Sequence, residues 1–480
     1  MNQNGTKIFL TCLTLTVAAC FCLSLLGIGA GGFLLWTEGK HAQDAAPPQS
    51  TPLPPAGNGA TPETATVTPF GDSSTPEASG EIPPEIARQM DEIEQQVQEL
   101  RGLQAAEPLQ RRLLSTEALR QRVLDDFLSD YTPEEAHDDA LALSAFGLLE
   151  PDYDLIGLYE DLYTEQVAGF YDDETDTMYV VQDADFSGVQ RMTYAHEYTH
   201  ALQDQNFGLG EALGMDEEHC KADSEHCAAM QAVVEGDATL SEETWLHTYA
   251  TPQDFQDIFA FYGEYQSPVY DSAPEFLKED FLFPYQQGKD FVQHLYDQGD
   301  WAAVNAAFTT QPQSTEQILH PERYPDDAPI AVTLPDLASA ISVGWREVDS
   351  GTLGEWYTYL MLAQGAAGSA RLPEDVAAEA AAGWGGDAYA VFFSPDESQF
   401  ALVLDMRWDT PSEANEFRRA LLRHASRRFD VATGTPAESL WTWSTDTLYS
   451  ALHQENARTV WLIAPDETTA EALWGLLTAP

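Results

Sequence analysis

Residues 194–200 contain two histidines four positions apart, with a glutamate directly after the first one. Residues at this spacing share one face of an α-helix, so a helix here would direct the imidazoles of His196 and His200 at a single ion. Glu197 would then reach the open side of that ion as a general base. Zinc prefers imidazole nitrogens in tetrahedral geometry, and a catalytic zinc keeps one coordination position for water. The alternative interpretation is an ordinary amphipathic helix with two surface histidines.

A catalytic zinc site needs a third protein ligand, and Glu235 is the candidate. It lies 35 residues after His200, in a segment whose pattern predicts a helix. Gly236 follows it, and so small a residue allows another helix to pack closely beside the site. The alternative for Glu235 is a solvent-facing helix glutamate. Histidines that bind a metal usually donate their other nitrogen to a carboxylate or carbonyl, and Asp204 and Asp237 are the candidates for that role.

Three short motifs follow one another along the chain: H-E-x-x-H at residues 196–200, E-G-x-A at 235–238 and P-Y-x-x-G at 284–288. This order resembles the gluzincin metallopeptidases of the thermolysin-like clan, and within that clan the aminopeptidase N-type enzymes. The resemblance covers about residues 165–300. It implies that His196, His200 and Glu235 bind Zn2+. It also implies that Glu197 is the general base and that Tyr285 donates a hydrogen bond to the oxyanion.

The chain departs from those aminopeptidases in two respects. The spacing from His200 to Glu235 is longer, and the G-x-M-E-N stretch that anchors a free amino terminus in them is absent. The resemblance therefore leaves endopeptidase and exopeptidase activity both open. For Tyr285, a buried structural tyrosine is the alternative.

From Ile8 to Trp36 the chain carries no charged side chain. These 29 mostly apolar residues are enough to cross a bilayer with some tilt. The short stub before them favours an N-terminus on the inside. We therefore predict that residues 1–36 form a single-pass cell-membrane anchor with the rest of the chain extracytoplasmic, an arrangement that fits a bacterial envelope. A lipoprotein with Cys20 as its lipidated N-terminus and a cleaved signal peptide are the alternatives.

The remaining sequence divides into three parts. Residues 37–80 are rich in Pro, Thr, Ser and Ala without a hydrophobic period, which predicts a disordered tether. Residues 81–325 are expected to form a mostly helical, zincin-like peptidase domain. Within it, apolar runs at 167–171 and 178–181 flank a turn-rich hexapeptide and predict a β-hairpin. That hairpin is either purely structural or offers an edge strand to an extended peptide.

Residues 326–480 are predicted to form a smaller α+β domain without a catalytic constellation. Its pattern reads strand, strand, helix, strand, strand, helix, which resembles a ferredoxin-like layer. The expected elements are strands at 388–393 and 401–408, a helix at 412–425, a hairpin from 448 to 463 and a helix at 467–477. The predicted fold class of the whole chain is therefore α+β, with a transmembrane helix, a helical peptidase domain that holds a small sheet, and this last domain.

The two cysteines outside the apolar N-terminal segment, Cys220 and Cys227, can form one disulfide, and two free thiols are the alternative. Seven positions apart on one helix, they would lie about 10 Å from each other, which is too far to bond. If they are bonded, the segment is predicted to be a loop.

The charge balance limits the function classes. The chain has 79 acidic and 22 basic side chains, a formal net charge of −57. It will not bind nucleic acid non-specifically, because phosphate contacts need Lys and Arg. We therefore predict a membrane-anchored, extracytoplasmic zinc metallopeptidase with peptide or protein substrates. The alternative is a catalytically inactive surface protein that binds partners on a degenerate peptidase scaffold.

Overall fold

The computed structural model describes residues 82–127, 131–166, 169–173, 175–181, 186–434 and 439–478. Within these ranges, no helix combines the length and the apolar character that crossing a bilayer requires. This finding corrects the predicted single-pass anchor and the predicted cell-membrane location, which no described element supports. The segments 1–36 and 37–80, on which the predicted anchor and tether fall, lie outside the described residues.

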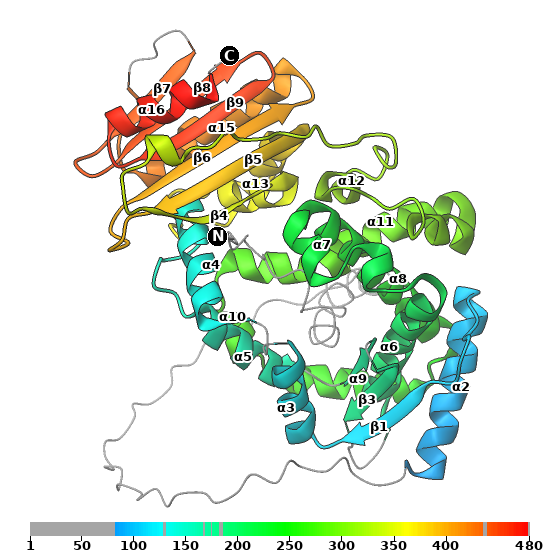
Figure 1. Cartoon of the computed structure of the whole chain (residues 1–480). Helices are drawn as coiled ribbons and strands as arrows, with labels where there is room; N and C mark the ends of the chain where they lie inside the picture. The colour runs from blue at the N-terminus through cyan, green and yellow to red at the C-terminus, as the bar shows by residue number, and fades with distance from the viewer. Residues whose placement is uncertain are drawn as a thin grey trace, which may run out of the picture.

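The first region of the structure is mostly helical and contains one small sheet (Figure 1). Its helices are α2 (Pro84–Arg101), α3 (Thr116–Phe127), α4 (Pro133–Phe146), α5 (Leu155–Gln166), α6 (Gly188–Phe207), α7 (Glu217–Ala222), α8 (Ser224–Tyr249), α9 (Pro252–Glu264), α10 (Pro268–Ser272), α11 (Glu275–Ala307) and α12 (Thr315–Leu319), with a 3-10 turn, η1 (Glu211–Leu213), before α7.

The small sheet contains β1 (Gln110–Leu114), β2 (Gly169–Asp172) and β3 (Thr177–Val181) in the order β1-β3-β2. Strand β1 runs parallel to β3, and β2 runs antiparallel to it. The predicted hairpin is therefore confirmed as β2 and β3. Strand β2 is an edge strand of this sheet, and it lies against α6.

Helix α6 is buried along most of its length, from Gly188 to Gln203. Its N-terminus is capped by Ser187 and Gln190: Oε1 of Gln190 accepts a hydrogen bond from the backbone N–H of Ser187 at 2.7 Å. Helices α2, α8 and α9 pack around it, together with β2 and β3. Because protein surrounds α6, each polar side chain that it carries needs a partner inside the fold.

Two glycines bring α8 and α11 into backbone contact beside α6. A Cβ atom added to Gly236 would lie 2.2 Å from the carbonyl carbon of Gly288, and one added to Gly288 would lie 2.2 Å from the carbonyl oxygen of Ala232. Real Cβ atoms essentially never approach another atom to less than 3.0 Å. The close helix packing predicted at Gly236 is therefore confirmed, and its partner is the glycine of the P-Y-x-x-G motif.

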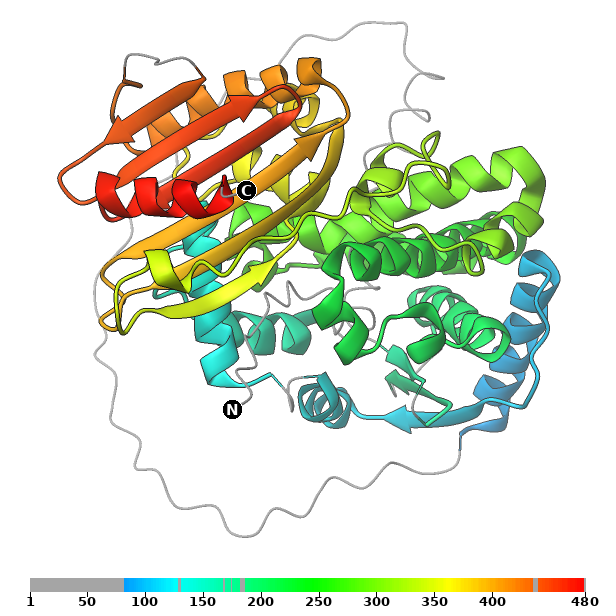
Figure 2. The ribbon, with the colours of Figure 1, turned by 45° about the horizontal axis from the view of Figure 1, so that its top comes forward.

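The second region is a six-stranded antiparallel sheet in the order β4-β5-β6-β9-β8-β7 (Figure 2). Its elements are β4 (Arg346–Gly351), α13 (Gly354–Ala363), α14 (Glu374–Ala381), β5 (Trp384–Phe393), β6 (Phe400–Trp408), α15 (Pro411–Arg428), β7 (Leu440–Ser444), β8 (Tyr449–Glu455), β9 (Arg458–Ala464) and α16 (Glu467–Leu477), preceded by the 3-10 turn η2 (Ala338–Ala340). The predicted strands and helices form at the expected places. The ferredoxin-like prediction is nevertheless wrong, because β4 and β7 extend the sheet on both sides.

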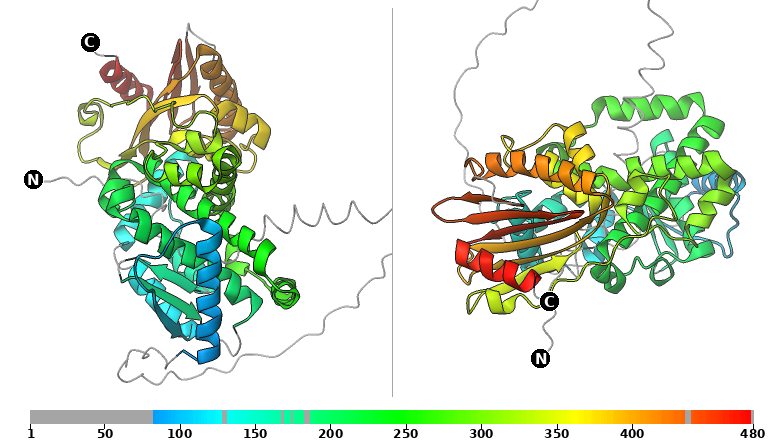
Figure 3. Two further views of the ribbon diagram at one scale, coloured as in Figure 1. Left: turned by 90° about the vertical axis from the view of Figure 1, so that its right-hand side faces the viewer. Right: turned by 90° about the horizontal axis from the view of Figure 1, so that it is seen from above.

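Helices cover both faces of this sheet. Seen from above, α15 and α16 lie on opposite sides of the strands (Figure 3). Alternate residues of β6 point to the two faces: Leu402 and Leu404 pack in the same core cluster as Phe417 of α15, whereas Val403 packs with Leu473 of α16. Since both faces are buried, the central strands read as nearly continuous apolar runs.

The two regions share one hydrophobic core. The ring of Phe146 in α4 meets Tyr389 of β5 edge to face, with centroids 5.2 Å apart. The rings of Phe283 in α11 and Trp356 in α13 lie 4.7 Å apart. The core cluster that contains these side chains also contains residues of α8 and α15. The sheet region is therefore packed onto the helices that surround α6.

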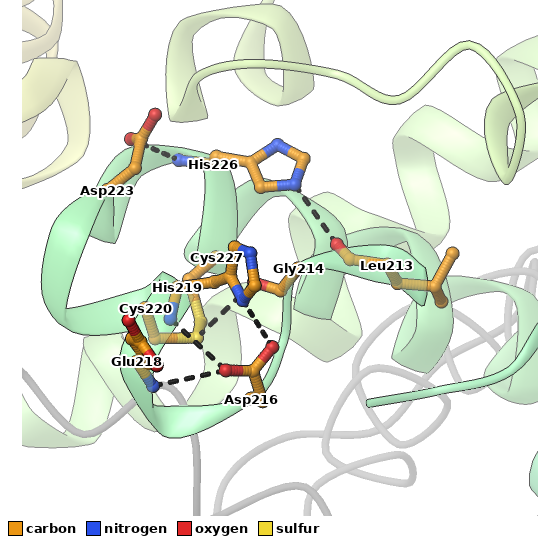
Figure 4. The surroundings of a disulfide bond; sticks show 9 residues. All are labelled: Leu213, Gly214, Asp216, Glu218, His219, Cys220, Asp223, His226 and Cys227. Carbon is orange, nitrogen blue, oxygen red and sulfur yellow. Dashed lines mark hydrogen bonds and ion pairs between the residues drawn. A yellow bond between two sulfur atoms is a disulfide. The ribbon is translucent and has the colours of Figure 1, made fainter. Parts of the chain in front are cut away.

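A disulfide joins Cys220 in α7 to Cys227 in α8, with Cα atoms 5.2 Å apart (Figure 4). The predicted loop is wrong, because both cysteines lie in helices. The helical path breaks at Asp223, whose φ and ψ are −146° and 85°. Its side chain accepts a hydrogen bond from the backbone N–H of His226 and caps α8. This break brings together two cysteines that a continuous helix would separate.

Candidate metal centre

Helices α6 and α8 bring His196, His200 and Glu235 together in the interior. Oε2 of Glu235 lies 3.2 Å from Nε2 of His196 and 3.5 Å from Nε2 of His200. The histidine rings have centroids 4.9 Å apart and are inclined by 75°. One ligand atom from each residue lies within 4.8 Å of the others, and all three side chains are buried. This group could therefore bind a metal ion.

The chemistry of the three donors suits a divalent metal of the zinc type. Two imidazole nitrogens and one carboxylate oxygen form the His2Glu set that catalytic zinc accepts. Burial by itself would raise the pKa of Glu235, but the charges and hydrogen bonds of His200 and His196 outweigh it and lower that pKa. The carboxylate thus stays charged although it is buried, which is the form in which it binds a cation.

Each histidine uses its Nδ1 atom on a different partner. Nδ1 of His196 lies 3.0 Å from Oε2 of Glu242 on α8, and Nδ1 of His200 lies 2.8 Å from Oε1 of Gln203 on α6. Both partners offer an oxygen, so the Nδ1 atoms donate and the Nε2 atoms are the ones left to face Glu235. These bonds orient both rings so that each Nε2 atom could bind a metal ion.

These two partners differ from the predicted ones. Asp204 accepts hydrogen bonds from the hydroxyl of Tyr171 and the backbone of Leu209 instead. Asp237 reaches His200 only through Gln203, whose amide lies between them. Sequence reasoning missed Glu242, although a signal existed: it follows Glu235 by two helical turns and so lies on the same face of α8.

Glu197 lies beside the three candidate ligands. Its side chain is 1 % exposed, and its Oε2 accepts a hydrogen bond from the backbone N–H of Tyr171 in β2 at 3.0 Å. Oε1 is buried and has no hydrogen-bond partner among the described groups. Burial is the main cause that raises the pKa of Glu197 to about 7. A carboxyl group with such a pKa can both accept and release a proton near neutral pH.

Tyr285 of α11 completes the group of residues from the three motifs. It is 3 % exposed, and its ring centroid lies 6.4 Å from that of His196. The glycine contact between α8 and α11 brings this tyrosine so close to the ligands. The fold thus gathers all five predicted site residues, His196, Glu197, His200, Glu235 and Tyr285, although the chain separates them by up to 89 positions, from 196 to 285.

A second group of carboxylates has a simpler explanation. Glu316, Asp327 and Asp409 lie close enough to share a cation. The guanidinium of Arg323 contacts all three, with Nη1 2.6 Å from Oδ2 of Asp409. Because an arginine already sits among these carboxylates, the group is an ion-pair network.

Residues 341–474 match a domain of unknown function (DUF8575). The match covers most of the six-stranded sheet region and leaves α6, α8 and α11 outside it. No curated protein and no solved structure matches the chain. The case for a function therefore rests on the geometry of the metal centre.

Proposed function

We propose that this chain is a zinc-dependent peptidase that hydrolyses peptide or protein substrates. The observation that carries the proposal is the convergence of His196, His200 and Glu235 next to the buried carboxyl group of Glu197. A purely structural metal site would need a fourth protein ligand. Within the described residues, the group that could hold a metal at this place has three members. A three-ligand set leaves room for the water that hydrolysis needs.

The side chains around the ligands have separate tasks in this proposal. Zinc at such a set lowers the pKa of water to about 7 and polarises a carbonyl group. Glu197 takes a proton from the attacking water and passes it to the leaving amine. Tyr285 donates a hydrogen bond to the oxyanion that develops on the scissile carbonyl.

Strand β2 offers a way to hold the substrate. It is the edge strand of its sheet, and its Tyr171 N–H already bonds to Glu197. An extended peptide that pairs with an edge strand gains main-chain hydrogen bonds that do not depend on its side chains. We propose that substrate backbone aligns along β2, which would place a scissile bond beside Glu197.

Zinc content tests the metal part of the proposal. The full-length protein should bind about one zinc ion per chain, as a single His2Glu site does. Glu235→Ala should lose it. Glu243→Ala is the matched control, because Glu243 lies on the same helix but pairs with Lys289 at 2.7 Å. Equal zinc content in all three proteins, or none in the parent after metal supplementation, would overturn the proposal.

Hydrolysis tests the catalytic part. Glu197→Gln should keep zinc and lose cleavage of labelled, unfolded casein by about 10²–10⁴-fold, the usual contribution of a general base. Full activity in this variant would refute the assigned role. A parent that binds zinc but cleaves neither casein nor a random peptide library would favour the inactive binding protein. The ends of the products would distinguish endopeptidase from exopeptidase activity.

A further inference from the structure

The two candidate histidine ligands are held by unlike partners. His196 donates to the carboxylate of Glu242. An ionised carboxylate has no hydrogen to donate, so it can only accept. His200 donates to the amide of Gln203, which could face it with either its oxygen or its nitrogen. If the nitrogen faced the ring, Nδ1 would have to accept, and Nε2 would carry the proton. His200 could then no longer bind a metal through Nε2.

The surroundings of Gln203 decide which way the amide points. Its Nε2 lies 2.9 Å from the carbonyl oxygen of Val234 and 2.9 Å from Oδ2 of Asp237. Both neighbours are acceptors, so both hydrogens of the amide are committed to them. Turning the amide over would set its oxygen against two other oxygens. Its Oε1 therefore has to face His200.

Asp237 is itself held by a fully buried arginine at the end of α2. Nε and Nη2 of Arg101 contact the two carboxylate oxygens at 2.6 and 3.1 Å, and both side chains are 0 % exposed. The guanidinium also lies over the ring of Trp301, 4.5 Å from its centroid. In the described part of the chain, Arg101 is the one Lys or Arg that is fully buried. It compensates the charge of Asp237, which would otherwise be costly in the interior.

We infer that the Arg101–Asp237 ion pair positions the metal centre from a distance. Through the amide of Gln203 it holds His200 in the tautomer that presents Nε2 to the metal. The inference rests on the proposed metal site and deepens it. It makes α2, which lies outside the three motifs, a requirement for tight zinc binding. Arg101, Asp237 and Gln203 are positioning residues, since they act through His200.

The test removes the ion pair without leaving a buried charge. Replacing both members of a buried pair by apolar residues is often neutral for stability. We therefore compare Arg101→Met/Asp237→Val with the parent by chelator competition for zinc in the full-length protein. The expected result is a Kd that is about 10–100-fold weaker, the range for lost partners of metal ligands. The matched control is Arg346→Met/Asp138→Val, which removes a two-point pair at 2.6 Å between β4 and α4. It should leave the Kd unchanged.

A purely structural role for the pair predicts a different outcome. It would change thermal unfolding but not the zinc Kd of the folded variant, and that result would overturn the inference. If the double variant fails to fold, Gln203→Met decides in its place, because it keeps the ion pair and removes the acceptor of His200. An unchanged Kd in Gln203→Met would equally overturn the inference.

Nitrogen NMR of histidine-labelled, metal-free protein provides a readout that needs no zinc. The parent should show Nδ1 of His200 protonated, and Arg101→Met/Asp237→Val should show a fraction in which Nδ1 carries no proton. A parent that binds no zinc would refute the proposed function, yet this tautomer measurement would still decide the inference. The same tautomer in both proteins would overturn it.

Discussion

The backbone contact between α8 and α11 lets us predict how Gly288→Ala changes helix packing, stability and zinc affinity. The new Cβ atom would lie 2.2 Å from the carbonyl oxygen of Ala232, and ordinary contact begins at 3.4 Å. The two helices must therefore separate by about 1.2 Å at this point, the difference between those two distances. Because the obstructing atom is backbone, no flexible side chain can move aside.

This separation has an energetic and a functional consequence. Overpacking of this kind costs about 1–3 kcal/mol and occasionally more, and a backbone obstacle places Gly288→Ala at the upper end. The better helix propensity of alanine returns about 1 kcal/mol, so the expected net loss is about 2 kcal/mol. Glu235 lies next to Gly236 at this contact. If Glu235 binds zinc as proposed, zinc affinity should fall as well, because metal–ligand distances vary by only about 0.2 Å.

Urea unfolding and zinc competition measure the two effects in the same samples. Gly263→Ala in α9 is the matched control, because a Cβ atom there would meet nothing within 4 Å. It should leave zinc affinity unchanged and stabilise the protein by up to about 1 kcal/mol. The reasoning is refuted if Gly288→Ala behaves like Gly263→Ala in both measurements.

Two further predictions concern stability. Burial is the main cause that raises the pKa of Glu225 to about 8 and those of Asp280 and Asp387 to about 6 each. The folded state then holds these protons more tightly than the unfolded state, so stability is greatest below the ordinary carboxyl pKa and is lost as pH rises toward 8. The urea midpoint should fall from pH 5 to pH 8, and a midpoint that rises over this range would contradict the assignment. Replacing Cys220 and Cys227 by serine should lower the free energy of unfolding by about 2–3 kcal/mol, from the entropy of a loop of eight residues; an unchanged free energy would mean that the bond constrains nothing in the unfolded chain.

The grouping of His196, His200 and Glu235 was predictable because its signals are local. Each motif specifies its residues at fixed helical spacing, and the order of the motifs supplied the rest. The hydrogen-bond partners of the histidines were harder to predict, because they depend on which faces of α6 and α8 point toward each other and toward β2. Asp204 follows His200 by one turn, yet it faces Tyr171 of β2. Gln203, one position earlier, points to Nδ1 of His200. A difference of one position is about 100° around a helix, and tertiary packing decides which of these two directions points to which neighbour.

In the six-stranded sheet, too, some strands could be predicted from the sequence and others could not. Strands β5 and β6 are long apolar runs buried on both faces, so their sequences identify them. Strand β4 reads Arg-Glu-Val-Asp-Ser-Gly, and such a polar run does not indicate a strand. The segment becomes a strand because it pairs with β5. Contacts from α4, such as the Asp138–Arg346 ion pair, also hold it in place. The break at Asp223 was missed for a related reason, since aspartate is compatible with a helix interior, a cap or a turn.

Two arginines connect separate parts of this fold. A chain with 79 acidic and 22 basic side chains offers every surface cation a choice of partners, so an arginine gains little from any one of them. A buried or partly buried arginine needs specific partners, and two such residues join separate parts of the fold. Arg101 joins the end of α2 to the helix that carries Glu235. Arg428 of α15 donates to the carbonyl oxygens of Ser144 and Ala145, at the end of α4. The first connects a peripheral helix to the candidate metal centre, and the second connects the sheet region to the helical region.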